Sequence, residues 1–385
     1  MRGFMHTTAK AALLSAALGL ACAAPALAEI KLGSVLAASG PASFLGDPEA
    51  KTLKMLVEQT NAAGGINGEQ ITLIEYDDGG DANKARTFAT RLVEDDEVVA
   101  VIGGTTTGST MAMVPVFEDA EIPFISLAGA VVIIDPVKTW VFKTPHTDRM
   151  ACQKIFEDMK GDGIAKIAIV SDTGGFGSSM RQQCLDVAGD YGIEVVADET
   201  YGPKDADMTP QLTKIKNTEG VQAVLNPGFG QGPAVVTRNF RQLGMTQALY
   251  QSHGVASQAY IDLSGDAAEG IRMAAPSLLV AEQLPAEDPQ KSVVMGYKTD
   301  YERTTGEPVS TFGGYAYDAF EMMKAAIAKA GSDDPAAIRD ALEGTAGYVG
   351  VTGEFNFSAE DHLGLDPSAF RMVEVKDGAY VLIAE

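Results

Sequence analysis

The chain of 385 residues has only three cysteines, four histidines and one tryptophan. His146, His253 and His362 lie more than 100 residues apart, and neither His-x-x-x-His nor Cys-x-x-Cys spacing occurs, so the sequence does not indicate a zinc site. The Gly-x-Ser-x-Gly turn of α/β-hydrolases is missing as well. Nothing marks out a catalytic pair among the many carboxylates, and we expect no metal, no cofactor and no enzymatic activity.

Basic residues are scarce too, since 29 Lys and Arg stand against 52 Asp and Glu, a formal net charge of −23. Such an acidic protein is a poor partner for nucleic acid or for anionic membranes. The run Asp77-Asp78-Gly79-Gly80-Asp81 lacks the final Glu of an EF-hand calcium loop. We expect Asp81 to cap the helix that follows it.

Long apolar runs are also absent. No apolar stretch reaches the roughly 20 residues that a membrane-spanning helix needs. At the N-terminus, Arg2 and Lys10 precede a short apolar stretch that ends at Pro25-Ala26-Leu27-Ala28. This pattern is typical of a secretory signal peptide and predicts export with cleavage after Ala28. Cys22 leaves a lipid anchor open as an alternative.

Removing 28 residues from 385 leaves 357, enough for two lobes with cores of their own. The mature chain keeps 27 Lys and Arg against 52 acids, a net charge of −25. Cys152 and Cys184 remain, in an oxidising compartment. A disulfide between them and a pair of buried free thiols are both open at this point, because spacing alone does not decide.

Strand and helix patterns alternate along the first part of the mature chain. Apolar runs predict strands at 29–36, 70–78, 98–104 and 122–128. Helical periodicity predicts a helix through Leu53 and Val57 that ends at Gly64-Gly65, a second after Asp81 and a third over 111–120. This order indicates a parallel sheet with helices on both faces.

The alternation restarts after residues 141–145, which predicts a second α/β sheet. Expected helices are 147–160, 178–191, 208–217 and 233–243, and expected strands are 166–172, 193–199, 221–227 and 248–252. Beyond Pro276 the pattern is mainly helical, over 289–304, 311–330 and 334–342, with short strands at 353–357, 369–375 and 379–384. These late helices must pack on an earlier sheet, so at least one lobe is discontinuous in sequence.

Ligands of open α/β sheets bind beyond the carboxyl ends of the strands, where this chain has loops rich in Gly, Ser and Thr. The stretch Val98–Thr110, VVAVIGGTTTGST, resembles a phosphate-binding loop but lacks its lysine. Free N–H groups at the start of a helix, with hydroxyls beside them, suit a carboxylate. Phe176 and Phe229 stand in two other glycine-rich loops, and exposed rings there are costly unless they cover something.

The segments Asn61–Ala85, 94–126, IAIVSDTGGFG, LTKIK, NFRQLGM and GYAYDAF resemble the periplasmic branched-chain amino acid binding proteins of ABC importers. The resemblance spans nearly the whole mature chain. It implies a type I periplasmic binding fold, in which two doubly wound parallel-sheet lobes are joined by a three-segment hinge and close on the ligand. The implied hinge crossings are 144–146, 275–279 and 350–353. Lobe 1 is then 29–145 plus 278–351, and lobe 2 is 146–277 plus 352–385.

The resemblance also implies a set of ligand-binding positions. Thr107, with Thr106 beside it, falls where the family grips the ligand's carboxylate, and a second grip matches Ala128, Gly129 and Ala130. Phe176 and Phe229 fall where lobe 2 closes rings over the ligand. Five positions depart from the family pattern. His253 replaces the acid that faces the ligand's ammonium, Leu45 replaces a common Tyr, Ala130 lacks the family's hydroxyl, and Gly80 and Thr106 replace a cysteine pair.

We therefore expect a periplasmic substrate-binding protein of a leucine-binding type, which acts as a monomer with an inner-membrane ABC permease. Its expected ligand is an amino acid or an apolar or aromatic organic acid, and the loss of the acid at His253 favours one without an α-amino group. Asp172 is an alternative partner for an ammonium. A sensory receptor and a binding protein for a short amide or urea-type solute are the competing functions.

Overall fold

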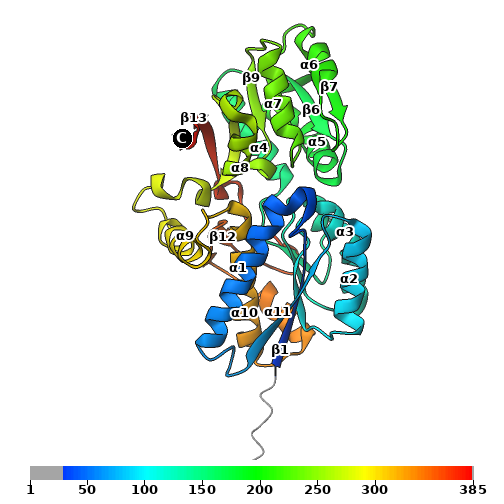
Figure 1. Cartoon of the computed structure of the whole chain (residues 1–385), viewed down its shortest axis with the longest axis vertical. Helices are drawn as coiled ribbons and strands as arrows, with labels where there is room; N and C mark the ends of the chain where they lie inside the picture. The colour runs from blue at the N-terminus through cyan, green and yellow to red at the C-terminus, as the bar shows by residue number, and fades with distance from the viewer. Residues whose placement is uncertain (1–28, 384–385) are drawn as a thin grey trace, which may run out of the picture.

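The structure, a computed structural model, describes residues 29–383 and consists of two stacked α/β lobes (Figure 1). The expected signal peptide, residues 1–28, lies outside the described residues. Lobe 1 is built on a sheet of five parallel strands in the order β2–β1–β3–β4–β5. These strands are β1 (Glu29–Leu36), β2 (Gln70–Asp77), β3 (Ala100–Gly103), β4 (Phe124–Ser126) and β5 (Val141–Lys143).

Helices cover both faces of the lobe 1 sheet, as Figure 1 shows. On one side lie α1 (Ser43–Ala62), α10 (Thr311–Ala330) and α11 (Pro335–Glu343), and on the other lie α2 (Ala82–Glu94) and α3 (Thr107–Ala120). Helix α10 begins and ends where its periodicity predicts. Helix α3 begins four residues before the expected Met111, so the threonine-rich turn is itself the first turn of the helix.

Lobe 2 contains a seven-stranded sheet in the order β14–β13–β10–β9–β8–β6–β7. Its strands are β6 (Lys166–Asp172), β7 (Glu194–Tyr201), β8 (Ala223–Asn226), β9 (Ala248–Gln251), β10 (Arg272–Pro276), β13 (Phe370–Lys376) and β14 (Ala379–Leu382). Its helices are α4 (Asp148–Gly161), α5 (Gly175–Val187), α6 (Thr209–Lys216), α7 (Gly232–Gln242) and α8 (Gln258–Ser264). Strands β13 and β14 pair antiparallel at one edge, a pairing that the order of elements left unassigned.

Short polar side chains and glycines set the helix ends that the sequence indicated. The Asp81 carboxylate accepts hydrogen bonds from the backbone N–H groups of Asn83 and Lys84 and thereby caps α2, as expected. Thr147 caps α4 in the same way, and α1 ends before Gly64 and Gly65, which both have positive φ.

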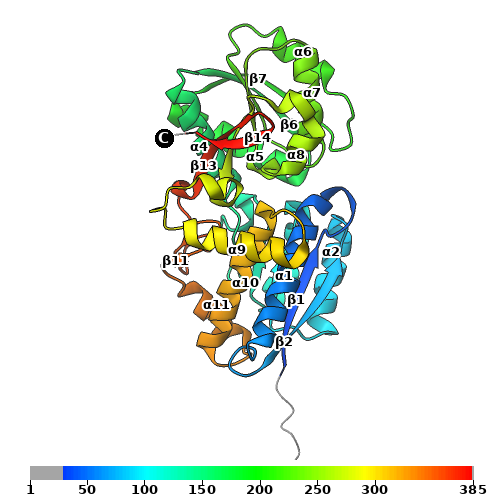
Figure 2. The ribbon, with the colours of Figure 1, turned by 60° about the vertical axis from the view of Figure 1, so that its left-hand side comes forward.

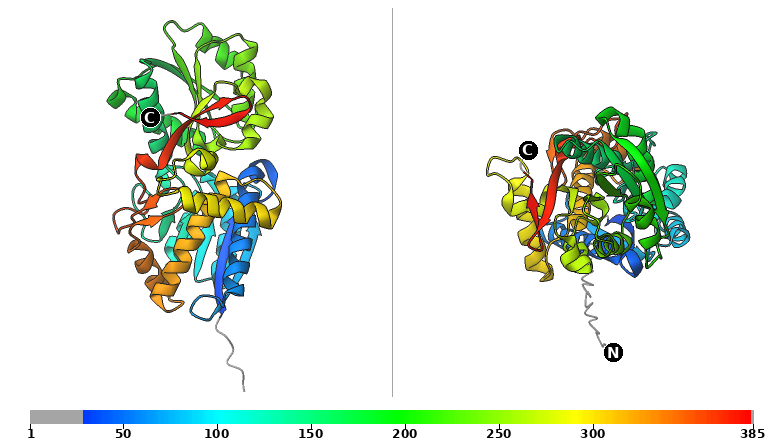
Figure 3. Two further views of the ribbon diagram at one scale, coloured as in Figure 1. Left: turned by 90° about the vertical axis from the view of Figure 1, so that its left-hand side faces the viewer. Right: turned by 90° about the horizontal axis from the view of Figure 1, so that it is seen from above.

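Three chain crossings join the lobes, so that the blue start and the orange helices share lobe 1 while the red C-terminal strands lie in lobe 2 (Figure 2). The first crossing follows β5, and the second follows β10, where η6 (Ser277–Gln283) leads to α9 (Lys291–Thr305). Helix α9 contacts both η6 and α1, and its yellow ribbon lies across the hinge side of lobe 1 (Figure 3).

The third crossing lies later than the predicted 350–353. The two-stranded sheet of β11 (Tyr348–Val349) and β12 (Glu354–Phe355) leads to Phe357, whose ring packs on Phe142 of β5. The backbone N–H of Lys143 donates to the carbonyl of His362, so this residue is still attached to lobe 1. The chain therefore crosses between His362 and Phe370. The residues from 352 to 362 therefore pack with lobe 1, whereas the predicted boundary placed them in lobe 2. The segments around the crossing are short and weakly periodic, so the sequence did not reveal its position.

Candidate functional site

A pocket with about 430 Å³ of empty volume, open solvent included, lies between the two lobes. The residues that line it come from loops at the carboxyl ends of both sheets and from the first turns of α1, α3, α5 and α10: Leu45, Thr105, Thr106, Thr107, Leu127, Gly129, Pro145, Phe176, Phe229, His253, Gly254, Phe312 and Tyr315. Seven of the nine residues expected to bind ligand are in this set. Their contact with a ligand remains a prediction, and Ala128 and Ala130 do not line the pocket.

Lobe 1 contributes hydroxyl groups and a helix N-terminus. Thr106 is the N-cap of α3, and its Oγ1 accepts a hydrogen bond from the backbone N–H of Ser109 at 3.1 Å. Thr107 is the first residue of the helix, where backbone N–H groups have no acceptor within the helix. Within residues 29–383 its buried Oγ1 also has no hydrogen-bond partner. The turn therefore presents unpaired donors and the positive end of the helix dipole to the pocket.

Thr105 is a pocket residue that the sequence analysis did not single out. Its Oγ1 lies 3.0 Å from the backbone N of Ala37 and 2.5 Å from Oε2 of Glu49, so the side chain is held in place from two sides. It lies in the same run of threonines as the two expected residues, which was the available signal. Glu49 follows Leu45 by one helical turn in α1, and nothing in the sequence distinguished it from the other acids.

The loop after β4 differs from the expected second grip in one respect. The backbone N–H of Ala128 donates to Ser126 Oγ at 3.2 Å and is thus already used within the loop. Gly129, in contrast, faces lobe 2 at very close range. An added Cβ there would lie 2.9 Å from His253 Nε2 and 3.0 Å from a ring carbon of Phe176, so any side chain would push the lobes apart.

Lobe 2 contributes aromatic rings. Phe176, in the first turn of α5, is buried and makes an edge-to-face contact with Phe229, with ring centroids 6.2 Å apart. Both rings are held by one carboxylate: Asp172 accepts hydrogen bonds from the backbone N–H groups of Gly174 and Phe229, at 2.6 and 3.2 Å. Burial raises the pKa of Asp172 to about 6. Asp172 does not line this inner pocket. It lines an adjoining hollow, the outer cleft, together with Lys204 and with the pocket residues Thr106, Thr107, Phe176 and Phe229.

His253 is enclosed by aromatic rings. It lies edge-to-face with Phe176 and Phe370, with centroid distances of 5.3 Å in both cases. Burial holds the pKa of its imidazole well below the ordinary value, and nearby His146 and Lys143 lower it further. The ring is therefore neutral, and neither of its nitrogens has a partner among the described residues. One nitrogen donates and the other accepts, so His253 offers a ligand a hydrogen bond of either kind but no charge.

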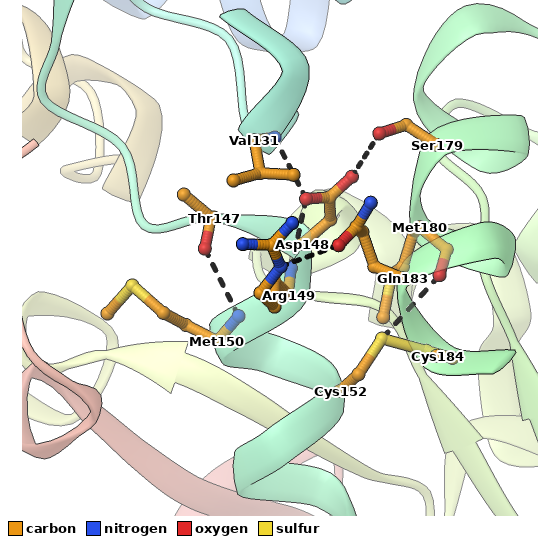
Figure 4. The surroundings of a disulfide bond; sticks show 10 residues. All are labelled: Val131, Thr147, Asp148, Arg149, Met150, Cys152, Ser179, Met180, Gln183 and Cys184. Carbon is orange, nitrogen blue, oxygen red and sulfur yellow. Dashed lines mark hydrogen bonds between the residues drawn. A yellow bond between two sulfur atoms is a disulfide. The ribbon is translucent and has the colours of Figure 1, made fainter. Parts of the chain in front are cut away.

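The helix that carries Phe176 is fastened to its neighbour by a disulfide. Cys152 in α4 and Cys184 in α5 are bonded, which settles the pairing that spacing left open. Figure 4 shows a second connection above it, where the Asp148 carboxylate accepts hydrogen bonds from Ser179 Oγ and from the backbone N–H of Val131. Because Val131 belongs to lobe 1, the same carboxylate ties α5 to the facing lobe.

The lobes meet at the pocket edge, where an added Cβ on Gly175 would lie 3.7 Å from the Cβ of Thr107.

Across the described part of the chain, no group of three or more His, Cys, Asp or Glu side chains is arranged to hold a metal ion. None of the helices between residues 29 and 383 has the length and apolar character needed to cross a bilayer.

Known proteins resemble this chain over most of its length. A profile of the family described as "Periplasmic binding protein" matches residues 29–379. The leucine-, isoleucine-, valine-, threonine-, and alanine-binding protein of Pseudomonas aeruginosa is 28% identical over 350 residues, which cover 90% of each chain. The Leu/Ile/Val-binding protein of Escherichia coli is 28% identical over 338 residues, 86% of this chain and 88% of its own. The structure of an extracellular ligand-binding receptor from Rhodopseudomonas palustris matches with a TM-score of 0.86 at 28% identity, covering 92% of this chain and all of the other.

Proposed function

This chain belongs to the periplasmic binding protein family, and from that premise we propose that it captures a small carboxylate-bearing solute between its lobes and presents it to an inner-membrane ABC permease. The observation that carries the proposal is the inner pocket, in which unpaired donors at the start of α3 face two phenylalanine rings. It needs no catalytic group, since closure around the ligand is the whole activity.

We further propose that the ligand has an apolar or aromatic body and no α-amino group. No carboxylate lines the inner pocket within the described residues, and His253 there is neutral. A buried ammonium without an acidic partner would cost several kcal/mol. The Phe176 and Phe229 rings instead suit a flat or branched apolar body.

A branched-chain amino acid is the competing ligand, because two relatives of this chain are named as binding leucine, isoleucine and valine. Leucine and 4-methylpentanoate separate the two ligand classes, since they share a skeleton and differ only in the amino group. We expect 4-methylpentanoate or benzoate to bind at least tenfold more tightly than leucine in titration calorimetry. Tighter binding of leucine would overturn the deamino assignment and leave the binding-protein function intact.

His253 offers a matched variant for the same measurement. His253→Glu restores an acid beside the ligand and should raise the affinity for leucine relative to 4-methylpentanoate, whereas His253→Gln, which keeps hydrogen bonding without charge, should leave the ratio near that of the parent protein. An unchanged ratio in His253→Glu would remove His253 from ligand recognition.

A further inference from the structure

A buried acid lies behind the threonine-rich wall of the pocket. Glu49 is fully buried in α1, one turn beyond the pocket residue Leu45. Its Oε2 lies 2.5 Å from Oγ1 of Thr105, and its Oε1 has no hydrogen-bond partner among the residues that the structure describes. A buried carboxyl oxygen without a donor indicates that the group is not simply a satisfied carboxylate.

The groups around Glu49 disfavour a negative charge there. Asp78, the residue after β2, is a second buried carboxyl, and a negative charge on it repels one on Glu49. Tyr315 of α10 is a neutral phenol nearby. Burial raises the pKa of the Glu49 carboxyl well above its ordinary value, the hydrogen bond with Thr105 lowers this pKa in part, and Asp78 raises it again. Neither neighbour is a cation that would favour an ionised Glu49.

The protonation state of Glu49 decides what Thr105 can offer a ligand. A threonine hydroxyl has one hydrogen to donate and two lone pairs that accept. The backbone N–H of Ala37 occupies one lone pair at 3.0 Å. An ionised Glu49 would take the hydroxyl hydrogen, and nothing would be left to donate into the pocket. A protonated Glu49 donates to the second lone pair and leaves the Thr105 hydrogen for the pocket side.

We propose that Glu49 is a protonated positioning residue that donates to Thr105 Oγ1 and so turns the Thr105 hydroxyl toward the ligand's carboxylate. This inference rests on the proposed carboxylate function. The anionic ligand then binds next to Thr105 while Glu49, behind Thr105, stays protonated. Ionising Glu49 weakens binding twice, because it withdraws the Thr105 donor and sets a negative charge behind the carboxylate.

Infrared difference spectroscopy tests the proton directly. The carbonyl stretch of a protonated carboxylic acid is separate from that of a carboxylate, and the spectrum of the parent protein minus that of Glu49→Gln isolates Glu49 from other buried acids such as Asp318. We expect a protonated-acid band at pH 7 in the ligand-free protein. Its absence would show that Glu49 is ionised and would overturn the inference.

Binding of 4-methylpentanoate and benzoate tests the consequence. The amide that Glu49→Gln introduces donates to Thr105 as the protonated acid does, so this variant should keep Kd within about threefold of the parent value. Thr105→Val should raise Kd by about tenfold to a hundredfold, while Thr105→Ser, which keeps the hydroxyl, should restore binding. At high pH, Kd of the parent protein should rise only where the infrared band fades, by up to about tenfold per pH unit, and Kd of Glu49→Gln should not follow.

The outcomes separate this inference from the proposed function. If both acids bind but the band is missing, or if Thr105→Val binds as well as the parent, then Glu49 does not act through Thr105 and the carboxylate function survives. If neither of these acids nor leucine binds at any pH, the carboxylate function fails, and the role of Thr105 fails with it. Asp172→Asn is the control for pH effects, since it removes an acid of the outer cleft and should leave the Glu49 band in place.

Discussion

The two lobes face the same pocket with different chemistry. Lobe 1 presents hydroxyls and the first turn of α3, which are groups that recognise negative charge at fixed positions. Lobe 2 presents Phe176, Phe229 and the neutral ring of His253, which exclude water and add contact area. This difference fits the function that we propose, in which lobe 1 binds the carboxylate of the ligand and lobe 2 covers its body.

The lobes also differ in how their pocket residues are held. In lobe 1 the support is by side-chain hydrogen bonds, since Thr106 caps α3 and Glu49 of α1 contacts Thr105. In lobe 2 a carboxylate joins two loops, through Asp172, and a covalent disulfide joins two helices. Variants that remove these supports should therefore act on stability, whereas variants of the groups that face the pocket should act on affinity in lobe 1 and on ligand release in lobe 2.

The largest expected effect is loss of the disulfide. Cys152 and Cys184 are 32 positions apart, so the double Cys→Ser variant should lose about 3 to 4 kcal/mol of unfolding free energy. Denaturant unfolding of the oxidised parent and the variant, followed by circular dichroism, measures this. Reduced parent protein is the control and should match the variant. Equal unfolding free energies of the oxidised parent and the variant would show that the disulfide does not stabilise lobe 2.

Asp172 should make lobe 2 sensitive to pH. Burial raises its pKa from 3.8 to about 6, so the folded protein binds this proton more tightly than the unfolded chain. The stabilisation is complete below pH 3.8 and is lost as the pH rises through about 6, roughly 3 kcal/mol in total. The unfolding free energy of Asp172→Asn should fall less steeply between pH 4 and 7 than that of the parent. Parallel curves would contradict the shift.

Thr107→Val should weaken carboxylate binding by about 2 kcal/mol, since the charged group loses a donor while the side-chain shape is kept. Calorimetry with benzoate measures the change, and Thr107→Ser should bind like the parent. Thr106→Val is the contrasting variant: it removes a helix cap and should lower the unfolding free energy by about 1 kcal/mol. Unchanged affinity in Thr107→Val would separate the start of α3 from ligand recognition.

Among the pocket residues, the smallest effect on binding is expected from the lobe 2 rings. Phe229→Ala should speed ligand release by about tenfold, or about 1.4 kcal/mol, with little change in the association rate, because affinity changes within one interface act mainly on dissociation. Stopped-flow displacement of benzoate measures the release rate, and Phe229→Leu should fall between parent and alanine. An off-rate equal to that of the parent would place the ring outside the occupied pocket and break the division between the lobes.

Strong local signals were enough to predict most of the elements. Helix α10 has the predicted bounds because its apolar stripe is long, and Asp81 caps α2 because a short acid before a helix binds its first N–H groups. The third crossing was predicted at earlier residues than the structure has it, and the pairing of β13 with β14 was not predicted. Short strands have no periodicity of their own, and their partners lie far away in the sequence.

The candidate site was predictable where it depends on residue types in loops. Threonines at a strand-to-helix turn and phenylalanines among glycines stood out, and the structure places Thr107, Phe176 and Phe229 in one pocket. Tyr315 and Glu49 did not stand out, because each lies within an ordinary helix. The hydrogen bond from the Ala128 N–H to Ser126 Oγ depends on the orientation of the serine side chain, which the spacing of residues in the sequence does not determine.

By itself, the sequence determined the alternating elements, the acidic charge and the chemistry of each loop, because these depend on residues close together in the chain. Tertiary structure decided which loops meet, that Cys152 and Cys184 bond, and that Glu49 and His253 are shut away from water. Contact and burial arise only when distant segments pack together, and burial determines whether an acid or an imidazole carries charge.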